Sequence, residues 1–112
     1  MISQVGYTKK TVEVNHRHFL VQVLPYYNGN FISITEGKER LGTLVVSISS
    51  GGRVSTAAVI PTKSETIFLK MVSERVASTI NGICIFSLNI EKDLDLDSMK
   101  VLMNELMEII KQ

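Results

Sequence analysis

The feature that most constrains this fold is a change of hydrophobic period at Pro61. Before it, apolar residues recur at every second position, most clearly in Leu41–Ser49. After it, they recur at three- and four-residue spacing from Ile67 to Ile80. A period of two is typical of strands and a period near 3.6 of helices. The first half of the chain should therefore be strands, and helices should enter only after Pro61.

Five strands are expected before Pro61, at residues 10–15, 19–24, 31–35, 41–49 and 54–60. Pro25 is expected to end the second of them, because proline cannot donate to a ladder. Asn28-Gly29 and Gly51-Gly52 predict tight hairpin turns, since these residues tolerate positive φ. Residues 36–40 are polar and read as a solvated connection.

Beyond Pro61 we expect a helix, a strand and a second helix. Ser64 is the candidate cap of the first helix and Asn81-Gly82 its stop. Residues 83–90 are apolar almost throughout, which places that strand centrally in the sheet. Asp97 or Ser98 should cap the last helix, roughly residues 98–111.

These elements predict a single α+β domain over residues 1–112. Its core would be an antiparallel sheet of about six strands, in the chain order β-β-β-β-β-α-β-α, with two helices packed on one face. Strands that follow one another directly favour an antiparallel meander.

The chain carries more apolar surface than one such layer can bury. The last helix is apolar over more than one stripe, and Met99, Met103 and Met107 recur along it at four-residue spacing. The second sheet face is expected to present Val45 and Ala57 or Ala58. We take these residues as candidates for a protein interface, with ordinary exposed surface and core packing as the alternatives.

No pattern in the sequence indicates catalysis or a cofactor. A calcium loop starting at Asp93 would need glycine where Ser98 stands and glutamate where Asn104 stands. His16 and His18 have no cysteine nearby to complete a metal site. The single cysteine, Cys84, sits in an apolar run and reads as a buried hydrophobe. We therefore predict no enzyme, no cofactor and no metal.

The formal net charge is +1 and the basic residues are scattered. No broad positive field is present, so neither nucleic acid nor a membrane is an expected partner. The N-terminal residues lack a signal-peptide pattern, and no apolar run reaches the roughly 18 residues of a membrane span. We expect a cytoplasmic protein, with the nucleus as a further compartment.

The chain resembles the eukaryotic proteasome assembly chaperone 3 family over roughly residues 8–110. The resemblance begins at residues 29–34 and continues with Gly42-Thr43-Leu44-Val45, the near-literal motif. The strand at 54–60, the apolar strand at 83–88 and the last helix follow in the family's order.

The resemblance implies a small α+β dimer, formed with a second copy or with a related chaperone, that holds proteasome α-subunits during α-ring assembly. The chain ends without a tyrosine at the penultimate position, so docking by a C-terminal tail is not expected. Two alternatives stay open. One is an adaptor subunit of an unrelated complex, built as a profilin-like or roadblock-like module. The other is an enzyme that combines Glu13 or Glu36 with His16.

Overall fold

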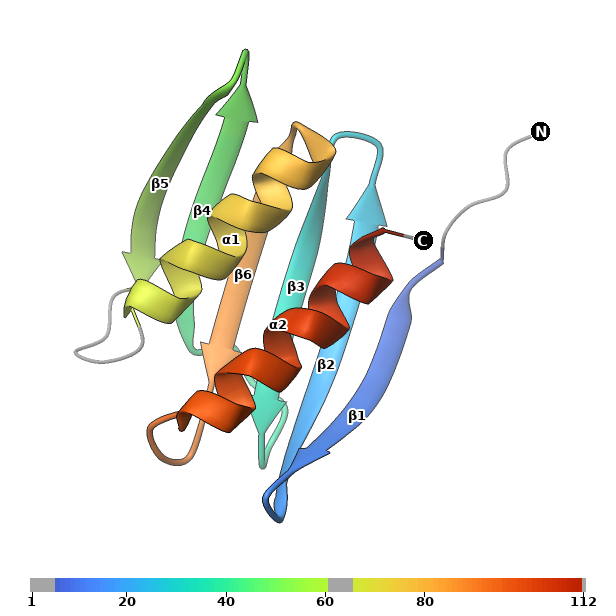
Figure 1. Cartoon of the computed structure of the whole chain (residues 1–112), viewed down its shortest axis with the longest axis vertical. Coiled ribbons are helices and arrows are strands. Elements are labelled where there is room, and N and C mark those ends of the chain that lie inside the picture. The colour runs from blue at the N-terminus through green and yellow to red at the C-terminus, as the bar shows by residue number, and fades with distance from the viewer. Residues whose placement is uncertain (1–5, 61–65, 112) are drawn as a thin grey trace.

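The structure is a computed structural model that describes residues 6–60 and 66–111. Figure 1 shows a twisted sheet with two helices lying side by side across it. The strands and helices are, in chain order, β1 (Thr8–Val14), β2 (Arg17–Tyr26), β3 (Gly29–Glu36), β4 (Thr43–Ser50), β5 (Arg53–Ile60), α1 (Thr66–Ile80), β6 (Ile83–Asn89) and α2 (Leu96–Ile110). The expected α+β class and the order of elements are confirmed.

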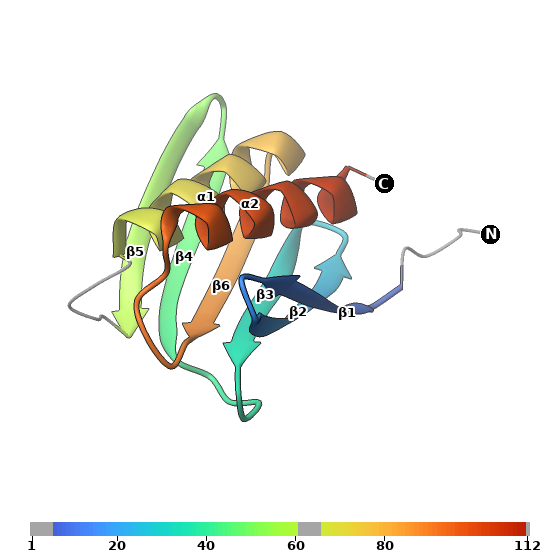
Figure 2. The same ribbon diagram turned by 60° about the horizontal axis from the view of Figure 1, so that its bottom comes forward.

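The six strands form one sheet in the spatial order β1-β2-β3-β6-β4-β5. Both helices cover the same face of it (Figures 1 and 2). The central position predicted for β6 is confirmed, but the simple meander is wrong. The segment from β5 through α1 crosses back over the sheet and returns the chain between β3 and β4. Strand β6 is therefore parallel to β3 and antiparallel to β4.

The core lies between the sheet and the helices. Its sheet side is made of alternate apolar residues on β2, β3 and β6, and its helix side of the inward stripes of α1 and α2. Fully buried members include Phe19, Val21, Ile32, Ile34 and Phe86 from the sheet, and Leu69, Val72, Val76, Leu102 and Leu106 from the helices.

Val45 also belongs to this core. It pairs with Phe86 across β6 and is fully buried beneath the helices. The expectation that Val45 lies on the second sheet face is therefore wrong. Ala58 is the partner of Val45 on β5, so its side chain is on the helix side as well, although it is exposed at the sheet edge. On β4 the helix-facing set is Thr43, Val45, Ser47 and Ser49, and the more apolar set Leu44, Val46 and Ile48 lies on the opposite face, so alternation alone indicates the wrong face for Val45.

Two turn predictions need correction. Pro25 does not end β2, which runs on to Tyr26. Strand β1 stops pairing at Val23, so β2 has only one neighbour at Pro25, where a missing N–H is tolerated. The β2–β3 turn does lie at Asn28, but Gly29 is already in β3. A Cβ added to Gly29 would lie 2.4 Å from the carbonyl oxygen of Ile83, so glycine permits the close approach of β6.

The helix termini were only partly predicted. Asn81 has φ 51° and ends α1 as expected, whereas Ser64 lies outside the described residues. The cap of α2 is Asp95, not Asp97 or Ser98. Its carboxylate accepts hydrogen bonds from the backbone N–H of Ser98 at 3.1 Å and from its hydroxyl at 2.7 Å. These bonds lower the pKa of Asp95 to about 2.

A buried ion pair lies beneath the start of α2. Arg17 donates to both carboxylate oxygens of Glu36, with Nε–Oε2 at 2.9 Å and Nη2–Oε1 at 2.7 Å. Its guanidinium also lies 5.1 Å from the centre of the Phe19 ring, and the Glu36 carboxylate accepts the backbone N–H of Glu91. The expectation of a solvated connection beginning at Glu36 is wrong.

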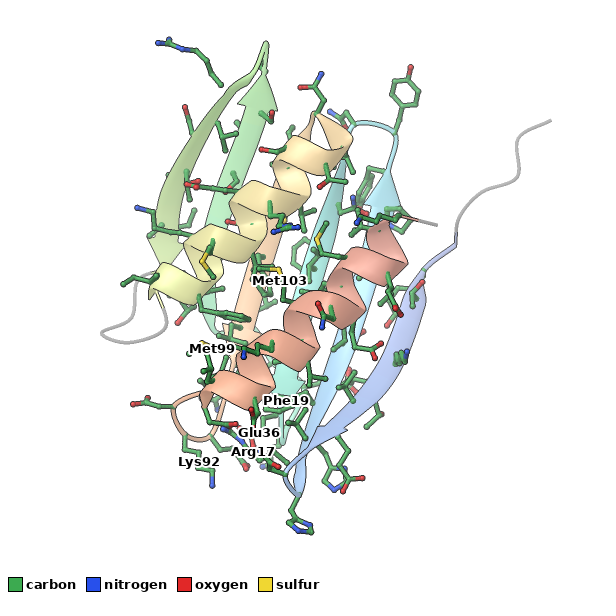
Figure 3. The ribbon with its side chains drawn as sticks, in the orientation of Figure 1. Arg17, Phe19, Glu36, Lys92, Met99 and Met103 are labelled. Carbon is green, nitrogen blue, oxygen red and sulfur yellow. The ribbon has the colours of Figure 1, made fainter. Side chains whose placement is uncertain are left out.

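The same guanidinium holds the loop between β6 and α2. It donates to the carbonyl oxygens of Lys92 and Asp93, each at 2.9 Å, and to the Asp95 carboxylate at 3.2 Å. Figure 3 shows Arg17, Glu36 and Lys92 gathered where this loop meets the sheet. One side chain from β2 thus fixes the residue at which α2 begins.

Replacing Arg17 with methionine should lower the free energy of unfolding by about 3 kcal/mol at pH 7, because it leaves the Glu36 carboxylate buried without a cation. The hydrogen bonds from Arg17 lower the pKa of Glu36 in the folded wild type. The ionised Glu36 therefore contributes to the free energy of unfolding above its unfolded pKa of about 4.3, and this contribution is lost as the pH falls through its folded pKa. In the variant, burial favours the protonated acid, opposed by the Glu91 N–H and Lys92 but no longer by Arg17. The difference in free energy of unfolding between wild type and Arg17→Met should therefore shrink below about pH 4. Urea unfolding at several pH values measures this difference.

The matched control is Lys10→Met, which breaks an exposed ion pair with Glu105 and should cost far less stability. An Arg17→Met protein as stable as Lys10→Met at pH 7, or one whose loss grows in acid, would contradict this role for Arg17.

Candidate protein-binding surfaces

The described residues contain no cluster of histidine, cysteine and carboxylate side chains able to hold a metal ion. His16 lies in the β1–β2 turn with φ 66°, and Glu36 is bound by Arg17. Burial raises the pKa of the Cys84 thiol to about 12, so it stays protonated. In the described part of the chain, neither helix is long and apolar enough to span a membrane. The polar groups just described stabilise the fold. We therefore look for the candidate site on the apolar surfaces of the domain.

The face of the sheet opposite the helices carries an unbroken apolar row. Strand register places five side chains directly beside one another across β2, β3, β6, β4 and β5, and cross-strand partners lie on the same face. They are Leu24, Phe31, Ile85, Val46 and Ala57. We call this row and its apolar neighbours the open sheet face.

Further apolar residues widen the row on both sides. Ile83 and Ile48 follow it toward the β4–β5 turn, and Leu44 and Ile60 flank it in the other direction. Ile48 is 48% exposed and Ile60 is 47% exposed. Within the described strands, charged side chains on this face occur only on β1 and at the start of β5. Such a patch, apolar at its centre and polar at its margins, is typical of a protein interface.

The open sheet face is not flat. One hollow of about 300 Å³ is lined by Tyr7, Leu24 and Leu41 together with Phe31. A second, of about 260 Å³, is lined by Tyr26, Ile83 and Ile85, again with Phe31. The Phe31 ring thus stands between two concave sites that can receive side chains of another surface.

A second apolar surface lies between the helices. A groove of about 370 Å³ is lined by Phe68 and Met71 of α1 and by Leu96, Met99, Lys100, Met103 and Asn104 of α2. We call it the methionine groove. Figure 3 shows Met99 and Met103 on the side of α2 that faces α1. Met107, the third residue of the predicted stripe, is buried in the core. The stripe therefore divides between a surface groove and the core.

One basic residue lines the methionine groove, and a second lies one helical turn beyond its lining residue Met71. Lys100 follows Leu96 by one helical turn and lines the groove, and Arg75 follows Met71 by one turn on α1. Both are exposed. Among the described residues, neither forms an ion pair, in contrast to Lys10, Arg17 and Lys9. None of the described residues that line the groove is acidic.

Comparison with known proteins identifies the fold. No family model matches the sequence, and no curated protein matches it. A solved structure described as a novel chaperone complex for yeast 20S proteasome assembly superposes with a TM-score of 0.70, over 94% of this chain and 94% of that one, at 15% identity. The two chains share one fold. The resemblance noted from Gly42–Val45 and the order of elements is confirmed at that level.

Of the five interface candidates, two line an accessible groove, Met99 and Met103. Val45 and Met107 are in the core, and Ala58 is on the helix side of an edge strand. An uncovered sheet face with apolar residues was expected, but of the residues that lie on it only Ala57 was named. The sequence signal of this face is the alternate set Leu44, Val46 and Ile48 of β4, which is the more apolar set of that strand yet faces away from the helices.

Proposed function

We propose that this protein is a proteasome assembly chaperone that binds α-subunits of the 20S core particle and promotes α-ring assembly as a dimer, without catalysis or a cofactor. The observation that carries the proposal is the fold shared over 94% of both chains with the yeast chaperone complex. Two apolar surfaces on opposite sides of the domain support it, because an assembly factor must hold more than one protein at once. Its place of action would be the cytoplasm.

We assign self-association to the open sheet face, with a second copy of this chain as the occupant. Six strands about 4.8 Å apart and about eight residues long present roughly 700 Å² on one face. This is close to the ~800 Å² that each partner contributes to a standard interface. Two such faces pack as in a β-sandwich, in which apolar side chains of both sheets interdigitate. A related chaperone of the same fold would replace the second copy in a heterodimer.

Neighbouring alanines on β5 test this assignment. Ala57 belongs to the open sheet face, whereas Ala58 is on the helix side. Ala57→Glu should weaken self-association at least about tenfold, because it buries a carboxylate without a partner. Ala58→Glu introduces the same charge one residue away and should leave the dimer intact. Sedimentation velocity over a concentration series measures both, with circular dichroism to confirm folding.

A third variant, Val46→Glu at the centre of the row, should give a folded monomer. Dimers that survive both Ala57→Glu and Val46→Glu would reject the open sheet face as the contact. So would an Ala58→Glu protein that dissociates equally.

The function itself is tested by co-purifying the tagged protein with each proteasome α-subunit separately and sizing the products. We expect a discrete complex with at least one α-subunit and no tagged protein in mature core particles. A folded dimer that binds none of them would favour the adaptor subunit of an unrelated complex.

A further inference from the structure

We propose that the methionine groove binds an amphipathic helix of a partner protein, one that carries acidic residues beside its apolar stripe. The identification of that partner as a proteasome α-subunit rests on the proposed function, whereas the chemistry of the groove does not.

The walls of the groove determine what it can hold. They are two α-helices, whose backbone groups are bonded within each helix and offer no ladder to an extended strand. Recognition must therefore come from side chains. Phe68 forms a buried floor, Met99 and Met103 are half-buried walls, and Met71 and Leu96 stand at the edges, 54% and 64% exposed. The apolar stripe of a partner helix, with its three- and four-residue spacing, fits between the side-chain ridges of α1 and α2.

The methionines suit this task. Three of the five methionines in the chain line the groove. Their unbranched side chains adapt to irregular apolar surfaces, as in proteins that bind several different helices. One groove can thus bind helices of different sequence with similar affinity.

Charge selects the partner's chemistry. Lys100 lines the groove and Arg75 lies one turn beyond Met71, and among the described residues neither forms an ion pair; their positive charge favours carboxylates on the occupant and speeds its association at low salt. A second copy fits poorly. A two-fold contact through this surface would bring both cations toward their own counterparts, and like charges facing across an interface oppose binding.

The first test uses a probe that needs no knowledge of the client. Two blocked peptides of about five helical turns carry leucine every third or fourth position, one flanked by glutamates and the other by lysines. We expect the acidic peptide to bind the full-length protein about tenfold more tightly in fluorescence anisotropy. Its addition should shift the methyl resonances of Met71, Met99 and Met103, and leave Met107 unmoved.

Charge reversal supplies the matched variants. The double variant Arg75→Glu with Lys100→Glu should remove the preference for the acidic peptide or invert it. Lys38→Glu reverses one exposed charge in the β3–β4 connection, half of the change in the double variant, and should alter nothing because it lies away from the groove. Equal binding of the two peptides to the wild type, or methyl shifts confined to other residues, would overturn the proposal.

The same variants separate this inference from the proposed function. If wild type and double variant bind α-subunits equally, the protein is still a chaperone but the groove is not its client site. If no α-subunit binds wild type while the acidic peptide does, the groove assignment stands and the chaperone function fails. A loss of about tenfold in α-subunit affinity, with the dimer unchanged, supports both.

Discussion

The placement of α2 depends on the guanidinium of Arg17. Its bidentate contact with Glu36 ties β2 to β3, and its bonds to the carbonyls of Lys92 and Asp93 tie both strands to the loop that follows β6. Because that loop ends at the helix cap Asp95, Arg17 holds the segment from which α2 starts. Helix α2 forms one wall of the methionine groove and α1 the other, so a buried charge at the end of the sheet anchors the base of an element that builds an apolar surface.

A second constraint is that the sheet has two faces, whereas the single layer of helices covers only one of them. Strand β6 carries apolar residues on both faces and β4 carries most of its apolar residues on the face away from the helices, whereas the two helices cover only one face of the sheet (Figure 2). The other face keeps the row from Leu24 to Ala57 in contact with solvent in the isolated chain. Self-association and client binding can therefore use different sides of the domain, and a dimer formed through its sheets would leave both methionine grooves accessible on its outer surfaces.

Hydrophobic period was enough to predict the elements, their order and the central place of β6, since these follow from local alternation and from a strand apolar on both faces. It did not predict the insertion of β6 beside β3, which depends on where α1 returns the chain. Assigning Val45 and Ala58 to the wrong face has a similar cause, because tertiary packing places the helices over the set of β4 that holds Val45 with three hydroxyl residues, and leaves the more apolar set uncovered. Arg17 looked like one scattered cation among others, since its partners lie 19 and more residues away in the sequence.

Site-specific photocrosslinking tests most directly whether the open sheet face and the methionine groove bind different partners. A photoreactive residue at Ile48 reports on the open sheet face, and one at Met71 on the methionine groove. The account predicts that position 48 crosslinks to a second copy of the chain and position 71 to a proteasome α-subunit. Capture of an α-subunit at position 48, or of a second copy at position 71, would contradict it.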